Sequence, residues 1–257
     1  MSTLVKLTAV EGRLFLREPM AVIFGVVFPT ILLLGMGAIP VLREPSPDFG
    51  GARFVEFWAP SALVLGLGIL GVQHIPATIA TYRENGILRR MSTTPVHPGK
   101  VLAAQLIVAL AAAAAAAGLL VVAAWLVLDV PLPEHPWWFT LAFVVGYGAL
   151  LAIGILIAAV TPNVRTANGF AMLAYMAFMF LGGVFLPRFT LPDVVVRIGD
   201  YTPPGVQALL DAWFGDTGAA TAVGVETAGP PQLAQLAIMA LIAVAAGAVA
   251  AKLFRWE

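Results

Sequence analysis

The chain has 257 residues, of which 60% are hydrophobic and 11% charged, and its mean hydropathy is +0.94. Soluble domains carry about 25% charged residues, so this composition excludes an ordinary soluble fold. The formal net charge is zero, which gives a nucleic-acid partner no electrostatic support. Cysteine is absent, which excludes disulfides, thiol catalysis and cysteine-bound metals.

Six apolar stretches are long enough to cross a membrane, which takes about 20 helical residues. None contains an acidic residue, and the only basic one is Lys252 near an end. We therefore predict an all-α, polytopic membrane protein with a single transmembrane domain over residues 1–257. The predicted spans are residues 20–42, 58–80, 101–128, 137–160, 167–186 and 233–254.

The distribution of basic residues predicts the orientation of these spans, because lysine and arginine concentrate in cytoplasmic segments. When the connections are assigned alternately to the two sides, ten of the 14 lysines and arginines fall on the side of the two termini. Ten of the 14 acidic residues fall on the other side. Both termini are therefore expected in the cytoplasm, in a plasma membrane.

Two further segments are predicted to contact the membrane without crossing it. Residues 1–19 place apolar side chains at helical spacing, which favours a helix in the inner interface. The outer segment, residues 187–232, contains a short apolar stretch that is predicted to form a helix capped by Thr202. This helix is too short to span the membrane, so we expect it to lie in the outer interface or to re-enter the membrane. Its predicted residues are Pro203 at the first position, then Val206, Leu209, Leu210, Trp213 and Phe214.

Known catalytic and nucleotide-binding motifs are absent from the sequence. Gly99-Lys100 lacks both the Ser/Thr and the first glycine of a phosphate-binding loop, and neither a His-Glu-x-x-His nor a Gly-x-Ser-x-Gly motif occurs. We therefore assign no catalytic, cofactor-binding or metal-binding residues and predict that the chain is not an enzyme.

The polar pair Gln73 and His74 stands out inside the second predicted span. A transporter driven by an ion gradient needs a group that takes up and releases the ion within the membrane, and His74 is the best candidate. The simpler interpretation is a hydrogen bond between helices. A secondary transporter centred on His74 stays open as an alternative.

The connection over residues 82–100 closely resembles one in the type-2 permease family of ATP-binding-cassette transporters. In that family a Glu-x-Gly-x-Leu-x-Arg segment, followed by Thr-Pro and a basic residue, joins spans two and three and docks into a separate ATPase. A second matching block begins at Gly182-Gly183-Val184-Phe185-Leu186-Pro187. The residues implied in ATPase coupling are Tyr82, Arg83, Glu84, Gly86, Ile87, Leu88, Arg90, Met91, Thr94 and Pro95.

The resemblance implies a membrane subunit of an ATP-driven exporter. Its partners would be a cytoplasmic ATPase subunit, which binds the ATP and Mg²⁺, and a second permease chain, expected to form a homodimer. The expected cargo is hydrophobic or amphiphilic, drug-like or lipid-like, as in antibiotic-resistance exporters, and membrane lipid surrounds the assembly. Export of a polysaccharide or glycolipid is the nearest alternative within the family.

Overall fold

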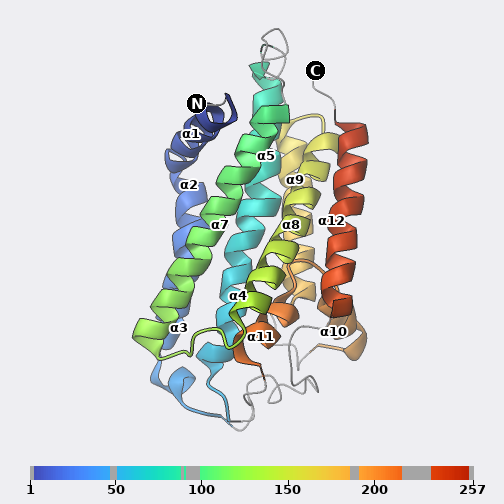
Figure 1. The fold of residues 1–257 in the computed structure, drawn as a ribbon. Helices are drawn as coiled ribbons and strands as arrows, with labels where there is room; N and C mark the ends of the chain where they lie inside the picture. The colour runs from blue at the N-terminus through green and yellow to red at the C-terminus, as the bar shows by residue number, and fades with distance from the viewer. Residues whose placement is uncertain are drawn as a thin grey trace.

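The computed structural model describes residues 3–46, 51–87, 90, 99–185, 191–215 and 233–254, and within these ranges the chain is a helical bundle without named strands (Figure 1). Its α-helices are α1 Thr3–Leu16, α2 Pro19–Val22, α3 Phe28–Gly37, α4 Phe54–Gly68, α5 Ile75–Glu84, α7 Gly99–Leu128, α8 Pro136–Val160, α9 Val164–Leu181, α10 Asp193–Asp200, α11 Val206–Phe214 and α12 Leu233–Leu253. Two π-helices, η1 Ile23–Val27 and η4 Ile69–His74, and a 3₁₀ turn, η2 Pro40–Arg43, complete the described elements.

Six helical runs in the described residues are long and apolar enough to cross a membrane, as predicted. They are Pro19–Gly37, Phe54–Glu84, Gly99–Leu128, Pro136–Val160, Val164–Leu181 and Leu233–Leu253. The first is shorter than predicted because Pro40 begins the 3₁₀ turn η2. The second is longer at both ends, since Glu56 bonds the backbone N–H of Arg53 at its start and α5 continues to Glu84.

The second span is the centre of the bundle. In its most apolar window 78% of the residues are buried, against 22% in the fifth span and 28% in the first and the last. Figure 1 shows α4 and α5 in the middle, with α1 and α2 on one side and α12 on the other. The first and fifth spans therefore expose most of their apolar side chains.

Both termini lie at the same end of the bundle as the C-terminal end of α5, the end predicted to face the cytoplasm (Figure 1). The helix α1 packs against α7 at this end, and α10 and α11 lie at the opposite end. This arrangement agrees with the predicted alternation of connections. The placement of α1 in the membrane interface stays a prediction.

Backbones approach closely where the second and fourth spans cross. A Cβ on Gly154 would collide with the carbonyl oxygen of Gly71, and one on Gly71 would lie 3.0 Å from the Cβ of Leu150. Only the absence of side chains at both glycines permits this contact. The Tyr147 hydroxyl adds a 3.1 Å hydrogen bond to the carbonyl of Ala109 on α7. The second, third and fourth spans are therefore held together as one core.

Candidate functional site

The inner end of the second span carries the connection that was predicted to dock an ATPase. The helix α5 ends at Glu84, and Gly86 then adopts a left-handed backbone with φ of 64°. A glycine is favoured at that position because side chains disfavour positive φ. Ile87 and Arg90 are helical again, and the Arg90 N–H donates to the carbonyl of Gly86 at 3.0 Å. The helix α5, which ends at Glu84, is thus separated by the turn at Gly86 from the helical residues that follow it.

Arg83 joins this end of the second span to the end of the fourth. Its Nη2 donates to the carbonyl oxygens of Ala158 at 2.9 Å and Thr161 at 2.6 Å. Ala158 lies in the last turn of α8 and Thr161 is its C-cap residue, so these carbonyls are at a helix end, where backbone acceptors have no partner within the helix. A guanidinium is well suited to this position because the helix dipole is negative at its C-terminal end.

Glu84 makes the complementary contact with the fifth span. Its Oε1 accepts a 2.7 Å hydrogen bond from the backbone N–H of Val164, the first residue of α9. Asn163 caps the same helix, accepting from the N–H of Thr166 at 2.9 Å. Arg83 and Glu84, adjacent in sequence, therefore hold the connection between α8 and α9 from both sides. We refer to these two residues and their acceptor and donor groups as the inner clamp.

The predicted coupling residues thus divide into groups. Tyr82, Arg83 and Glu84 lie on α5 and contact other helices of this chain, whereas Gly86, Ile87 and Arg90 lie beyond the helix end. Leu88, Met91, Thr94 and Pro95 lie outside the described residues. Docking of an ATPase on this connection stays a prediction. The intramolecular partners of Arg83 and Glu84 could not be inferred from the loop sequence alone.

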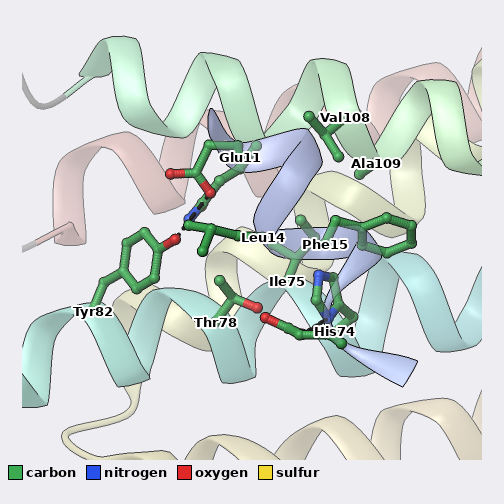
Figure 2. Close-up of a pocket in the computed structure, with 11 residues that line it drawn as sticks. Glu11, Leu14, Phe15, His74, Ile75, Thr78, Tyr82, Val108 and Ala109 are labelled. Atoms are coloured by element: carbon green, nitrogen blue, oxygen red, sulfur yellow. Dashed lines mark hydrogen bonds and ion pairs between the residues drawn. The ribbon is translucent and has the colours of Figure 1, made fainter. Parts of the chain in front are cut away.

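A polar pocket lies between α1, the second span and α7 (Figure 2). Tyr82 donates its hydroxyl proton to Glu11 Oε2 at 3.0 Å, and His74 Nδ1 lies 3.4 Å from Glu18 Oε2. The Phe15 ring meets the His74 ring edge to face, with centroids 5.4 Å apart. The pocket has a volume of about 20 Å³, which is enough for one water molecule.

Glu11 is a buried carboxyl that sequence reasoning did not single out. Burial raises the pKa of Glu11 above its ordinary value, and the hydrogen bond from Tyr82 opposes that shift. The buried side chain of Gln105 on α7 lines the same pocket, next to Glu11 and Tyr82. These groups connect α1 to the second and third spans. The polar site predicted at Gln73 and His74 is therefore part of a larger polar cluster.

Gln73 and His74 lie in η4, a π-helical segment of the second span. The first span contains a second π-helix, η1, and the two segments contact each other. π-Helical turns occur mostly as single turns inside α-helices, frequently at functional sites. Gln73 faces the fifth span, where its Nε2 lies 3.9 Å from the sulfur of Met172. His74 faces Glu18 and Phe15 instead.

The outer end contains the short apolar helix that was predicted, and it is buried in the bundle. All residues of α11 are buried, and the indole N–H of Trp213 donates to the carbonyl of Pro131 at 2.8 Å. The start of this helix differs from the prediction. Gly205, with φ of 77°, precedes the first residue, Val206, so Thr202 does not cap α11 and Pro203 is not in it. The Thr202 hydroxyl donates to the carbonyl of Ile198 instead.

Comparison with known proteins identifies the family. A family model described as "ABC-2 type transporter" matches residues 4–204. The chain belongs to this family. It is therefore a permease, the membrane transport component of an ABC system, and the family implies a partner subunit that binds ATP. No curated protein matches the chain.

The matched range covers the inner clamp, the polar pocket and the first five spans of the permease. Among its described residues, no group of three histidine, cysteine, aspartate or glutamate side chains could hold a metal ion. The family match, together with six apolar helical runs, makes the permease a multi-pass membrane transport component and not a catalytic ATPase domain.

Two features of the permease were missed by sequence reasoning. Asp211 was counted among the acids of the outer side, yet its side chain is only 1% exposed and accepts a 2.6 Å hydrogen bond from Gln207 Nε2. The helix α10 was not predicted, although Asp193 in its first turn and Arg197 in its last are the usual signals of helix ends.

Proposed function

We propose that this chain is the transmembrane subunit of an ATP-driven exporter, in which two copies form a homodimer and two cytoplasmic ATPase subunits dock on the connection over residues 82–100. ATP and Mg²⁺ bind to the ATPases. Both termini and the inner clamp face the cytoplasm of a cell whose plasma membrane holds the assembly. The cargo is a hydrophobic or amphiphilic molecule taken from the cytoplasm or the inner leaflet.

The observation that carries this proposal is the inner clamp. A force applied to the connection after Gly86 acts on α5, and Arg83 and Glu84 pass it to α8 and α9 through three short hydrogen bonds. One docking site can thereby move the second, fourth and fifth spans together. A loop whose only role was to join two helices would not need these contacts.

The proposal is tested by purifying the tagged chain from its native membrane and asking whether an ATPase subunit accompanies it. Leu88→Asp combined with Met91→Asp places two charges on the predicted docking residues and should abolish recovery of the ATPase. Lys252→Asp, a charge change at an exposed position near the end of α12, serves as the control and should leave recovery intact. Size-exclusion profiles show that each variant is folded.

Reconstitution in liposomes then separates the proposed exporter from the alternatives. Export of a lipophilic dye should require ATP and the ATPase subunit. Reproducible absence of an ATPase, together with dye movement that follows a proton gradient and stops on His74→Asn, would refute the proposal in favour of a secondary transporter. If a glycolipid is transported and the dye is not, the proposed ATP-driven mechanism would stand and the proposed class of cargo would be replaced by a glycolipid.

A further inference from the structure

The first, second and fifth spans enclose a long groove made of two cavities. The inner cavity has a volume of about 640 Å³ and the outer one about 570 Å³, and Tyr175 of α9 lines both. On the first span the lining residues recur at every fourth position: Met20, Phe24, Phe28, Leu32 and Met36. This spacing keeps one face of the helix along the groove over about 24 Å, most of the thickness of the hydrocarbon core.

Polar groups are concentrated at one end of this groove. The inner cavity is lined by four polar residues: Glu18 directly precedes the first span, Asn168 lies in the first turns of α9, and Gln73 and His74 lie within the second span about ten residues before its end at Glu84. The outer cavity is lined mainly by apolar and aromatic residues, among them Phe28, Phe57 and Trp58. A ligand that matches both parts has one polar end and a long apolar body.

The charge at the polar end of the groove determines which sign of charge a ligand's head group can carry. Glu18 directly precedes the first span. Among the described residues it is the only acidic one that lines either cavity, and no lysine or arginine lines them. Its side chain is 49% exposed. The Nδ1 of His74 lies 3.4 Å from this carboxylate, on the wall of the same cavity.

Aromatic rings next to the carboxylate favour the same sign of charge. Phe24 lines the inner cavity with a side chain that is 43% exposed, and Tyr175 lies farther along the groove. Aromatic faces attract cations, and ammonium groups held by rings and a carboxylate are a common mode of recognition. An anionic head group would meet the carboxylate of Glu18 without a compensating basic side chain.

We propose that this groove takes cationic amphiphiles, with the ammonium head group at Glu18 and the apolar body along the first and fifth spans toward Trp58. The inference rests on the proposed function in one respect, namely that the bound molecule is also the exported one. It then restricts the expected cargo from amphiphiles in general to lipophilic amines. Binding itself requires neither ATP nor the ATPase, so it can be measured separately from transport.

The test uses three rod-shaped probes that differ in one group: diphenylhexatriene, its trimethylammonium derivative and its propionic acid derivative. Because the chain contains no cysteine, Met172→Cys gives a single thiol on the wall of the inner cavity. The full chain in phosphatidylcholine nanodiscs is treated with a maleimide, and the probe concentration that halves the rate of thiol labelling is recorded. The cationic probe should protect at a concentration about tenfold below the neutral one, equivalent to about 1.4 kcal/mol, and the anionic probe should protect least.

Replacing the carboxylate provides the deciding comparison. Glu18→Gln keeps the acceptor for His74 and should bring the cationic and neutral probes to within about twofold of each other, whereas Glu18→Asp should keep the preference. Equal protection by all three probes in the parent, or a cation preference that survives Glu18→Gln, would overturn the inference. If the thiol of Met172→Cys does not react in the absence of probe, Phe24→Cys on the opposite wall is used in its place. If neither thiol reacts, the groove is already covered, and this result would also overturn the inference.

The same variants distinguish failure of this inference from failure of the proposed function. ATP-dependent export of the neutral probe that is insensitive to Glu18→Gln would refute only the cation preference. Cation-selective protection without any ATP-dependent movement would refute the exporter and leave the binding site in place.

Discussion

Removing the guanidinium of Arg83 should weaken both the fold and the coupling of ATP to transport. Arg83→Met keeps most of the apolar stem and removes the donors to the carbonyls of Ala158 and Thr161. A hydrogen bond from a charged donor contributes about 1.5 to 3 kcal/mol, and partial exposure to solvent reduces the sum for the two bonds to about 2–4 kcal/mol. At about 2–4 °C per kcal/mol, the melting temperature should fall by about 4–16 °C.

The assay combines thermal melting of the purified chain with transport by the reconstituted complex. Arg13→Met, at an exposed arginine on α1, is the matched control and should melt within about 1 °C of the parent. In Arg83→Met the ATPase should continue to hydrolyse ATP, but transport per ATP should fall because α8 no longer follows α5. Parental melting together with unchanged transport per ATP would refute the role assigned to the inner clamp.

Three further predictions concern the packing and the buried carboxyl. Burial raises the pKa of the Glu11 carboxyl in the folded state above its ordinary value of 4.5. The free energy of unfolding should therefore fall as the pH rises from 4.5 through the raised pKa of the folded state. Glu11→Gln should abolish this pH dependence, as measured by melting curves at a series of pH values. Gly154→Val should lower stability by about 1–3 kcal/mol or more because its side chain meets the facing backbone of η4, whereas Gly148→Val on the same helix meets nothing within 4 Å and should melt normally. Trp213→Ala should cost about 3–5 kcal/mol in chemical denaturation, while Trp137→Ala, 76% exposed, should stay within about 0.5 kcal/mol.

The sequence was sufficient for the number and order of the spans because the length of an apolar run is a local property. The ends of the spans were less certain, since they depend on groups elsewhere in the chain. The second span continues to Glu84 because Arg83 and Glu84 find partners on the connection between α8 and α9. Neither partner can be recognised from the neighbouring residues alone.

The loop motif led to the family, and the family model confirms that inference. The physical roles of the individual residues were not accessible in the same way. The motif residues at its start contact this chain's own helices, and the buried state of Glu11 and Asp211 follows from tertiary packing around them. The π-helical turns η1 and η4 also carry no clear sequence signal: η1 is as apolar as its α-helical neighbours, and the polar pair Gln73 and His74 in η4 does not by itself indicate a π-helix.

The uninterrupted length of the second span has a mechanical consequence. Its 31 helical residues extend over about 46 Å, so the helix projects beyond a hydrocarbon core of about 30 Å. Its outer end is anchored, because Arg53, next to Phe54, donates to the carbonyls of Leu128 at 2.8 Å and Asp129 at 2.7 Å. With that end as the fulcrum, a tilt of about 5° would carry the opposite end, at Glu84, through about 4 Å. The second span would then act as a lever arm that turns a small rotation into a displacement where the connection over residues 82–100 begins.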